Sequence, residues 1–363
     1  MDNLPNDLKL KILVRLPIKS LMRLKCLSKS WLSLISDPYF AKLHFQQSSQ
    51  QHPNRILYTN GPEILSIDFN LSLHDDSAIV KLDLPLFKSY ADRDFMTASC
   101  RGFVFLKPIN ERKVFLLNPS TRICKQIPLP PSKHNIRTLY GFCYDELADD
   151  YLIVLASEYK DPPSSGIHLL DFEVFSIRTN SWEEHGQFSV GYCSPSTVGF
   201  FLNNAVHWLV QTPSDIEIIA FDITTKSLRE IPTPFGRDCD FVEVMYDLRV
   251  LEGCLTVLVG MNGHDEIWMM REYGVKSSWT KFFSLSYSKL LDNIFPLCFT
   301  KDGQLVGGDG HIRLSKWNEK GELQERRQYF TQEKPERRQY YCCFSSSYYY
   351  LATPYTETLL SLP

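Results

Sequence analysis

The chain has 363 residues, of which 44% are hydrophobic and 13% aromatic, enough for one large β domain beside a smaller module. A net charge of −3 gives no case for nucleic acid or an anionic membrane as a partner, and no apolar run reaches the roughly 18 residues of a transmembrane helix. The ten cysteines include no C-x-x-C pair and no signal peptide is recognised, which predicts free thiols in a reducing compartment, the cytoplasm or the nucleus.

Residues 1–45 are predicted to form four short helices. The first is indicated by Pro5 in its first turn and by apolar residues at helical spacing, namely Leu8, Ile12, Leu13 and Leu16. The expected cap residues are Asn3, Ser20, Ser28 and Asp37, and the expected ends lie near Pro17, Cys26, Asp37 and Phe45. Helices this short are marginal alone in water, so they must pack on each other and on another surface.

The same segment is basic. It carries eight Lys and Arg against three Asp, a net charge of +5, which leaves −8 for residues 46–363. Pattern alone leaves open a small helical cap on the main domain or a helix-turn-helix DNA reader. The second interpretation lacks a recognition helix with clustered Asn, Gln and Arg.

Residues 4–40 resemble the F-box without a gap, from Leu4-Pro5 through Leu16-Pro17 and Trp31 to Asp37-Pro38. In that family the helices bind a Skp-type adaptor, which is joined to a cullin scaffold in an SCF ubiquitin ligase. The resemblance implies adaptor contacts, the last three shared with the core of the module, at Leu4, Pro5, Leu8, Ile12, Leu16, Pro17, Leu21, Leu24, Leu27, Trp31 and Leu34. The basic surface would steer the approach of an acidic adaptor.

Residues 46–54 are polar and are predicted to be a short linker to a β domain over residues 55–363. In that domain one pattern recurs: a strand, a turn of the form Asn/Asp/Ser-x-x-Thr, and a strand that ends near Pro. The turns begin at Asn118, Ser176 and Asp222, spaced by 58 and 46 residues, and looser copies surround Trp279 and Trp317.

A period of about 40–50 residues with several short strands per unit is typical of a β-propeller blade. The sequence therefore predicts a mainly β protein in which a small N-terminal α module precedes a propeller-like domain of about six blades. The first, divergent blade is expected near residues 55–67, and residues 348–360 are expected to supply a closing strand. An irregular array of β-sandwiches is the alternative.

Other parts of the β domain resemble the plant F-box-associated interaction domain. The similar stretches include Gly141-Phe142-x-Tyr144-Asp145, Ala205-Val206-His207-Trp208 and Glu272-Tyr273-Gly274. With the F-box, the resemblance covers nearly the whole chain, and the blades are kelch-like in period but not in their glycines. The subgroup includes S-locus F-box proteins of self-incompatibility and F-box proteins that control immune-receptor abundance.

Glu325-Arg-Arg-Gln-Tyr329 recurs eleven residues later at positions 336–340. We interpret the pair as a local duplication or an enlarged, solvated loop with excess positive charge. Recognition of a partner by the loop is the alternative, and it would depend on Arg326, Arg327, Arg337 and Arg338.

No motif of a hydrolase, metalloprotease or nucleotide-binding protein is recognised, so we expect no catalytic, cofactor-binding or metal-binding residues. Tryptophans at repeat positions are interpreted as blade-packing residues: Trp182, Trp208, Trp268, Trp279 and Trp317. The predicted function is a non-catalytic substrate receptor of an SCF-type ubiquitin ligase, which would bind the adaptor and an unidentified target protein. A ligase-independent scaffold and a propeller enzyme or glycan-binding protein are the alternatives.

Overall fold

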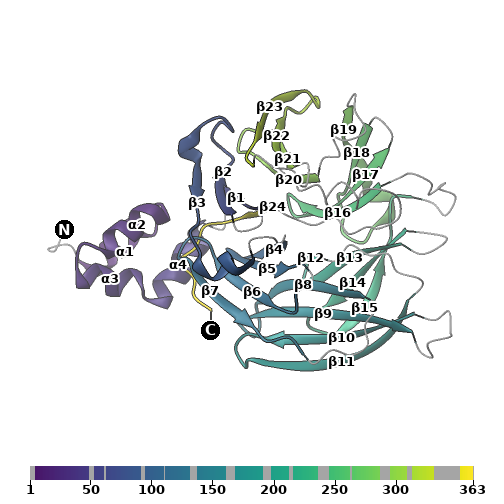
Figure 1. Ribbon diagram of the computed structural model, residues 1–363, viewed down its shortest axis with the longest axis horizontal. Helices are drawn as coiled ribbons and strands as arrows, with labels where there is room; N and C mark the ends of the chain where they lie inside the picture. Colours follow the sequence, from purple (N-terminus) through teal and green to yellow (C-terminus); the bar gives the residue numbers. More distant parts are fainter. Residues whose placement is uncertain are drawn as a thin grey trace.

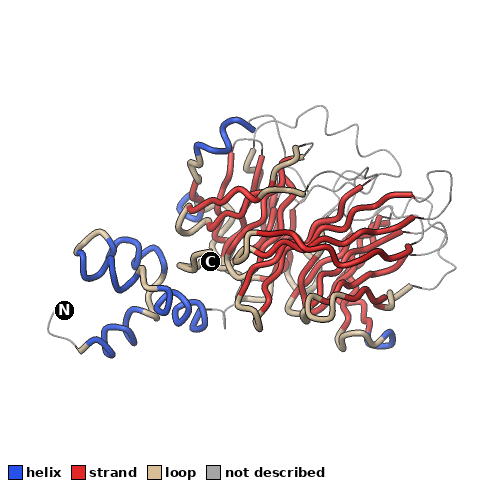
Figure 2. Tube along the Cα trace, turned by 90° about the horizontal axis from the view of Figure 1, so that it is seen from below, coloured by secondary structure: helices blue, strands red, loops and turns tan. Residues whose placement is uncertain are grey.

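The computed structural model describes residues 5–48, 53–60, 63–90, 95–109, 111–130, 137–160, 168–190, 198–211, 216–235, 245–261, 264–286, 295–308, 313–330 and 352–362. Within these ranges, four α-helices precede six four-stranded antiparallel sheets, which stand in a ring as the blades of a β-propeller (Figure 1). The helices form a separate group at one side of the ring (Figure 2). The predicted fold class is confirmed.

The helices are α1 (Asn6–Leu13), α2 (Ile18–Lys25), α3 (Lys29–Ile35) and α4 (Pro38–Ser48), and together they form the helical module, residues 5–48. Ser28 caps α3 as predicted, because its hydroxyl accepts a hydrogen bond from the Trp31 amide at 3.2 Å. At the start of α4, the Asp37 carboxylate accepts one from the Tyr39 amide at 2.7 Å.

Three of the predicted helix boundaries are wrong. Helix α1 ends at Leu13, four residues before Pro17, so Leu16 lies in the turn that follows the helix. The N-cap of α2 is Pro17, whose ring fixes a φ of −58°, so Ser20 lies inside the first turn and caps nothing. Helix α4 continues past Phe45 to Ser48, so the predicted linker begins as helix. Asn3, the expected cap of the first helix, lies outside the described residues.

Each blade is numbered in chain order. Blade 1 contains β24 (Ala352–Tyr355), β1 (Arg55–Asn60), β2 (Glu63–Asp68) and β3 (Ile79–Lys81). Blade 2 contains β4 (Phe95–Cys100), β5 (Phe103–Pro108), β6 (Val114–Asn118) and β7 (Ile123–Ile127). Blade 3 contains β8 (Arg137–Asp145), β9 (Asp150–Lys160), β10 (His168–Ser176) and β11 (Ser181–Val190).

The second half of the ring repeats this plan. Blade 4 contains β12 (Phe200–Leu202), β13 (Ala205–Gln211), β14 (Ile216–Asp222) and β15 (Ser227–Ile231). Blade 5 contains β16 (Met245–Leu251), β17 (Cys254–Met261), β18 (His264–Met270) and β19 (Trp279–Ser286). Blade 6 contains β20 (Phe295–Phe299), β21 (Leu305–Gly308), β22 (Arg313–Trp317) and β23 (Leu323–Gln328). Short 3₁₀ turns occur at Asp76–Ala78, Pro85–Tyr90 and Lys276–Ser278.

The ring closes between the start and the end of the β domain. Strand β24 pairs antiparallel with β1, with Tyr355 opposite Arg55 and Ala352 opposite Tyr58. The innermost strands β24, β4, β8, β12, β16 and β20 neighbour one another in a closed sequence. The predicted closing strand is therefore confirmed, and β1 has no free edge along these residues.

The recurrent sequence pattern forms the hairpin between the third and fourth strands of a blade. In blade 4, the Asp222 carboxylate accepts hydrogen bonds from the amides of Thr224 and Thr225, each at 2.9 Å. In blade 3, the Ser176 hydroxyl does the same for the Thr179 amide at 3.0 Å. A short polar side chain at the first position thus replaces backbone partners in the turn, which explains why this position repeats along the chain.

Tryptophans join neighbouring blades, as predicted. Trp182 and Trp279 lie in the first two residues of the outermost strands of blades 3 and 5. Their indole N–H groups donate to the carbonyls of Pro128 and Pro232 in the preceding blade, each at 2.8 Å. Trp208 is fully buried in the apolar cluster that joins blades 3 and 4. Trp268 packs against the apolar cluster between blades 4 and 5, and Trp317 lies in the one between blades 5 and 6.

The interpretation of the duplicated sequence as an enlarged loop is wrong for its first copy, because Glu325–Gln328 lies in strand β23 and only Tyr329 follows the strand. Arg327 donates to the Leu73 carbonyl at 2.8 Å and to the Asp76 carboxylate at 2.5 Å, while Glu325 accepts from the Leu73 amide at 2.5 Å. These side chains tie blade 6 to blade 1, so reversing their charge would disturb ring closure whatever the partner. The second copy lies outside the described residues.

Candidate partner-binding site

An apolar groove of about 300 Å³ lies on the helical module. Residues of α1 and α2 reach it because they recur at three- and four-residue spacing, which places them on one face of each helix. Trp31 of α3 completes the wall. The lining residues are Lys9, Ile12, Leu13, Leu16, Ser20, Arg23, Leu24 and Trp31.

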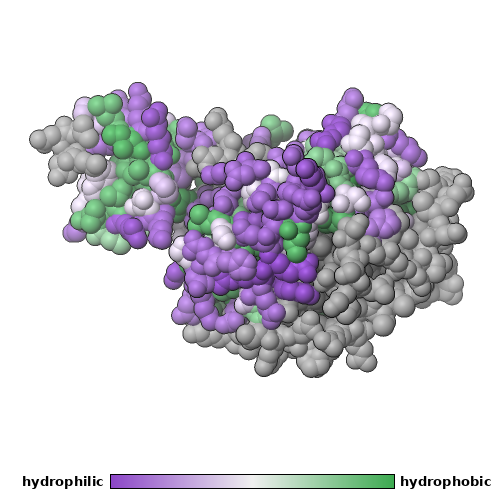
Figure 3. All heavy atoms as spheres, turned by 90° about the horizontal axis from the view of Figure 1, so that it is seen from above, coloured by the Kyte–Doolittle hydropathy of each residue, from purple (hydrophilic) through white to green (hydrophobic). Residues whose placement is uncertain are grey.

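Large apolar side chains are exposed on this module. Leu8 and Ile12 on α1 are 46% and 43% exposed, and Leu27, between α2 and α3, is 71% exposed. Figure 3 shows apolar side chains at the surface of the helices, bordered by hydrophilic ones. Solvent contact with so much apolar surface is unfavourable in a small module, and a partner that covered it would gain the transfer free energy.

The structure brings some of the predicted contact residues together. Ile12, Leu16, Leu24 and Trp31 all line the groove, and Leu8 lies one helical turn before Ile12 on the same exposed side of α1. These side chains form one continuous candidate surface.

The other predicted contact residues lie elsewhere. Leu21 is fully buried, so it supports the surface from beneath rather than presenting a side chain to a partner. Leu34 is half-buried against the core, and Leu27 is exposed away from the groove. Pro5 and Pro17 are exposed where α1 and α2 begin, and Leu4 lies outside the described residues.

Sequence reasoning missed the polar part of the groove. Lys9 and Arg23 contribute to its wall, and Ser20 lies there because it is inside α2. Helical spacing could have identified all three, since Lys9 precedes Ile12 by three residues and Ser20 precedes Arg23 by three. The groove is thus apolar in its interior with cationic side chains among its lining residues.

The opposite part of the module is packed on the propeller. Phe40, Ala41 and Phe45 of α4 are buried in one apolar cluster with residues of blades 2 and 3, including Phe103 and Tyr151. Arg101, in the β4–β5 turn, lies with its guanidinium 4.9 Å from the Phe45 ring centroid and 3.9 Å from that of Tyr144. We call these contacts, with those described next, the module–propeller interface.

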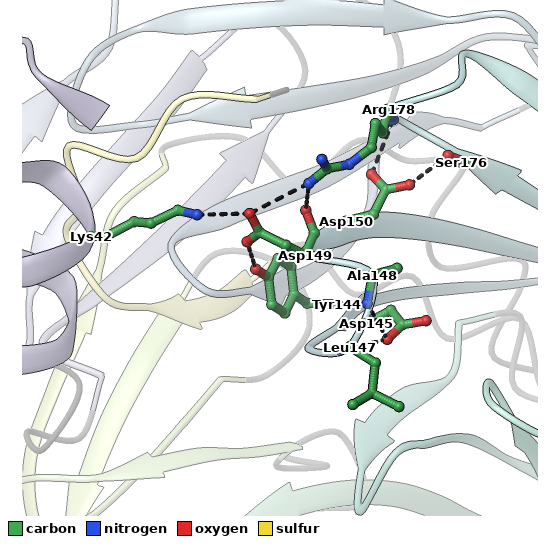
Figure 4. Close-up of polar contacts among 9 residues, drawn as sticks. All are labelled: Lys42, Tyr144, Asp145, Leu147, Ala148, Asp149, Asp150, Ser176 and Arg178. Atoms are coloured by element: carbon green, nitrogen blue, oxygen red, sulfur yellow. Dashed lines mark hydrogen bonds and ion pairs between the residues drawn. The ribbon is translucent and has the colours of Figure 1, made fainter. Parts of the chain in front are cut away.

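A charged cluster flanks this apolar contact (Figure 4). The Lys42 ammonium of α4 lies 2.7 Å from the carboxylate of Asp149 in the β8–β9 turn, and Arg178 lies 3.4 Å from the same carboxylate. Tyr144 donates its hydroxyl hydrogen to Asp149 as well. Asp150 fixes the neighbouring turn by accepting the Arg178 amide hydrogen at 3.0 Å.

These partners shift two pKa values. Hydrogen bonds from Lys42 and Tyr144 hold the pKa of Asp149 at about 2, so this carboxyl is ionised at all ordinary pH values. Burial and the bond to the carboxylate raise the pKa of Tyr144 to about 12, so it remains a donor. Asp149 therefore stays a charged acceptor, and Tyr144 stays its donor, across the physiological pH range.

The ion pair and the buried apolar contacts at this interface contribute different amounts of free energy. The side chains of Lys42 and Asp149 are about half exposed, and such surface pairs contribute only about 0.2–1 kcal/mol. Burying a phenylalanine such as Phe45, whose ring meets Arg101 of the propeller, contributes about 1.5–3 kcal/mol. Apolar burial thus supplies most of the docking free energy, and the charged cluster selects one orientation.

No group of three or more His, Cys, Asp and Glu side chains among the described residues is arranged to hold a metal ion. None of the helices in the described ranges is long and apolar enough to cross a membrane.

Comparison with known families agrees with this architecture. The family model of the F-box domain matches residues 1–43, and that of the F-box associated beta propeller domain matches residues 55–356. In Arabidopsis thaliana, the F-box/kelch-repeat protein At3g23880 is 29% identical over 322 residues, covering 84% of each chain. F-box protein CPR1 of the same plant is 26% identical over 341 residues, covering 84% of this chain and 79% of that one. The chain belongs to the family of F-box proteins that carry an F-box associated β-propeller domain.

Proposed function

We propose that this protein is the substrate-recognition subunit of an SCF-type ubiquitin ligase. The observation that supports this most directly is the apolar groove on α1 to α3, which is open while α4 is packed on the propeller. In this proposal a Skp-type adaptor, in turn bound to a cullin, covers the groove, and the propeller holds the target protein. The chain itself performs no bond chemistry.

The arrangement suits a receptor because its two binding parts are joined by a packed interface. A target held by the propeller would stay near a ubiquitin-charged enzyme that the cullin brings, so that target lysines meet the thioester at high effective concentration. The adaptor interface should depend on a few buried apolar anchors, each contributing at least ~2 kcal/mol. Lys9 and Arg23 would favour an adaptor with acidic groups beside its apolar contact.

Adaptor binding is tested by removing apolar contacts at the two helix starts. The double variant Leu8→Ala, Pro17→Ala should no longer capture a Skp-type adaptor. Its far-ultraviolet circular dichroism spectrum should still show a folded β domain. Leu32→Ala is the matched control, because Leu32 is an exposed leucine of α3 outside the groove. Undiminished adaptor capture by the double variant would refute the assigned contacts.

Target recruitment is tested by affinity capture from plant cells with the proteasome inhibited. The full chain is compared with one that lacks residues 1–45. Cullin and adaptor should appear only with the full chain, whereas proteins captured by both chains are candidate targets. Adaptor without cullin, and without ubiquitin transfer, would favour the ligase-independent scaffold.

A further inference from the structure

The C-terminal tail, residues 356–362, follows the strand that completes the ring. Strand β24 ends at Tyr355, opposite Arg55 of β1, so the tail adds nothing to the sheet hydrogen bonds of the described blades. It is nevertheless buried: Thr358 is fully buried, and Leu359 and Leu360 are nearly so. Surface tails are ordinarily polar and exposed, so this burial requires a structural explanation.

The backbone of the tail is held by blade 2. The buried Asn118 side chain donates to the carbonyls of Thr358 and Leu360 at 3.2 and 2.9 Å, and the Thr358 amide donates to Ser120 at 3.1 Å. A Cβ atom added at Gly102 would overlap the Thr358 side chain, so the β4–β5 turn is shaped to let the tail pass.

The tail also meets the point at which the chain enters the propeller from the module. The Asn54 amide donates to the Tyr355 carbonyl at 3.3 Å, and its side chain donates to the Glu357 carboxylate at 3.3 Å. Figures 1 and 2 both show the C-terminus beside α4. Leu359 and Leu360 belong to the same buried apolar cluster as the α4 side chains at the module–propeller interface.

We infer that the C-terminal tail is a positioning element that fixes the orientation of the F-box relative to the propeller. Its backbone is fixed to blade 2, and its leucines belong to the buried apolar cluster that also contains side chains of α4. Without them α4 would keep the charged cluster and the Arg101 contact but lose part of the buried apolar area that supplies most of the docking free energy. Under the proposed function, the tail sets where a bound target lies relative to the adaptor.

The test measures the distance between the two parts of the full-length protein. Spin labels on unnatural amino acids replace Lys29, exposed on α3, and Glu319, exposed in a turn of blade 6. Pulsed electron paramagnetic resonance then measures the distance distribution between the two labels. It is compared in the parent chain, in a chain that ends at Thr356, and in the full-length double variant Leu359→Ser, Leu360→Ser. Leu147→Ser, an 86% exposed leucine in the β8–β9 turn, is the control.

The parent and Leu147→Ser should give one narrow distance distribution, and both tail variants one at least about twofold broader. The double variant keeps β24 and the carbonyls that Asn118 binds. If the shortened chain proves less stable than the parent, the distance distribution of the double variant is therefore the one that tests the inference. A narrow, parent-like distribution in the double variant would overturn the inference. No adaptor is present, so this outcome is independent of the proposed ligase role.

Adaptor binding gives the second readout. Both tail variants should bind the adaptor within about threefold of the parent, because the groove is formed by α1 to α3 and not by α4 or the tail. Loss of adaptor binding without a broader distance distribution would make the tail part of the adaptor site, which also contradicts a positioning role.

Discussion

The helical module and the propeller distribute their apolar residues in opposite ways. The propeller encloses its aromatic side chains between blades, as in the Phe172–Phe221 pair, whose stacked rings are 4.7 Å apart. The module leaves Leu8 and Ile12 almost half exposed. The first arrangement maximises stability from the chain's own contacts, whereas the second leaves apolar surface that the adaptor would cover under the proposed function. Substitutions in the two parts should therefore have different readouts.

The largest effect is expected in the propeller core. Phe172→Ala removes a fully buried ring from the cluster between blades 3 and 4, so it should lower the free energy of unfolding by about 3–5 kcal/mol. Chemical denaturation measures this. Phe282→Ala, at a 39% exposed ring of β19, is the control and should cost less than about 1 kcal/mol. Similar costs would contradict the buried–exposed distinction.

The groove should show the reverse behaviour. Ile12→Ala should weaken adaptor binding by at least ~2 kcal/mol, roughly 30-fold, because a lining side chain is lost. Its effect on unfolding should stay below about 1 kcal/mol, since the side chain is already partly solvated. Calorimetric titration with the adaptor, beside Leu32→Ala, checks both expectations. An Ile12→Ala variant that lost stability but kept its affinity for the adaptor would contradict the assignment of Ile12 to the binding surface.

Two glycines allow the contact with the tail to be isolated. Gly102 and Gly253 occupy equivalent two-residue turns with φ of +81° and +70°, so alanine at either adds about 1–2 kcal/mol of backbone strain. At Gly253 the new Cβ meets nothing within 4 Å, whereas at Gly102 it would lie 2.7 Å from the Thr356 carbonyl oxygen. Gly102→Ala should thus cost at least about 1 kcal/mol more in unfolding experiments. Equal costs would show that the tail is free to move.

The smallest effect concerns the charged cluster. A carboxyl group with a depressed pKa stabilises the folded state above its unfolded pKa, and this contribution is lost as the pH falls toward the folded value of about 2. The stability difference between the parent and Asp149→Asn should therefore be largest above about pH 5 and shrink toward pH 3. Because the pair with Lys42 is half exposed, the difference should stay below ~1 kcal/mol and decrease with salt. A difference that grew on acidification would contradict the assigned pairing.

Local features of the molecule could be predicted from the sequence. The cap at Ser28 and the turns at Ser176 and Asp222 are signalled by residues a few positions apart, and so is the blade period. The error at Ser20 has a local cause, because both Pro17 and Ser20 are residues that can begin a helix. The helix begins after Pro17, whose ring fixes φ at a value that suits the N-cap. The error at Glu325–Tyr329 arose because a charged stretch resembles a loop when its partners in blade 1 are not known.

The module–propeller interface could not be predicted. Lys42 and Asp149 are 107 residues apart, and Asn118 and Leu360 are 242 residues apart, so no sequence pattern connects them. The groove could be predicted in part from the sequence, because helical spacing relates Ile12 to Leu16 and Ser20 to Leu24. That Leu21 is buried and Leu27 is exposed depends on how the helices cross, which periodicity in segments this short does not determine.

Strand β24 pairs with a strand 300 residues earlier, and this separation has a consequence for synthesis. On the ribosome the helical module and every other blade emerge before the residues that close the ring, so β1 has an open edge until β24 has been synthesised. A message interrupted before residue 352 would yield a complete F-box whose propeller is unclosed and whose tail is missing. Under the proposed function, such a product would occupy adaptor molecules without presenting a target, and would compete with the intact protein.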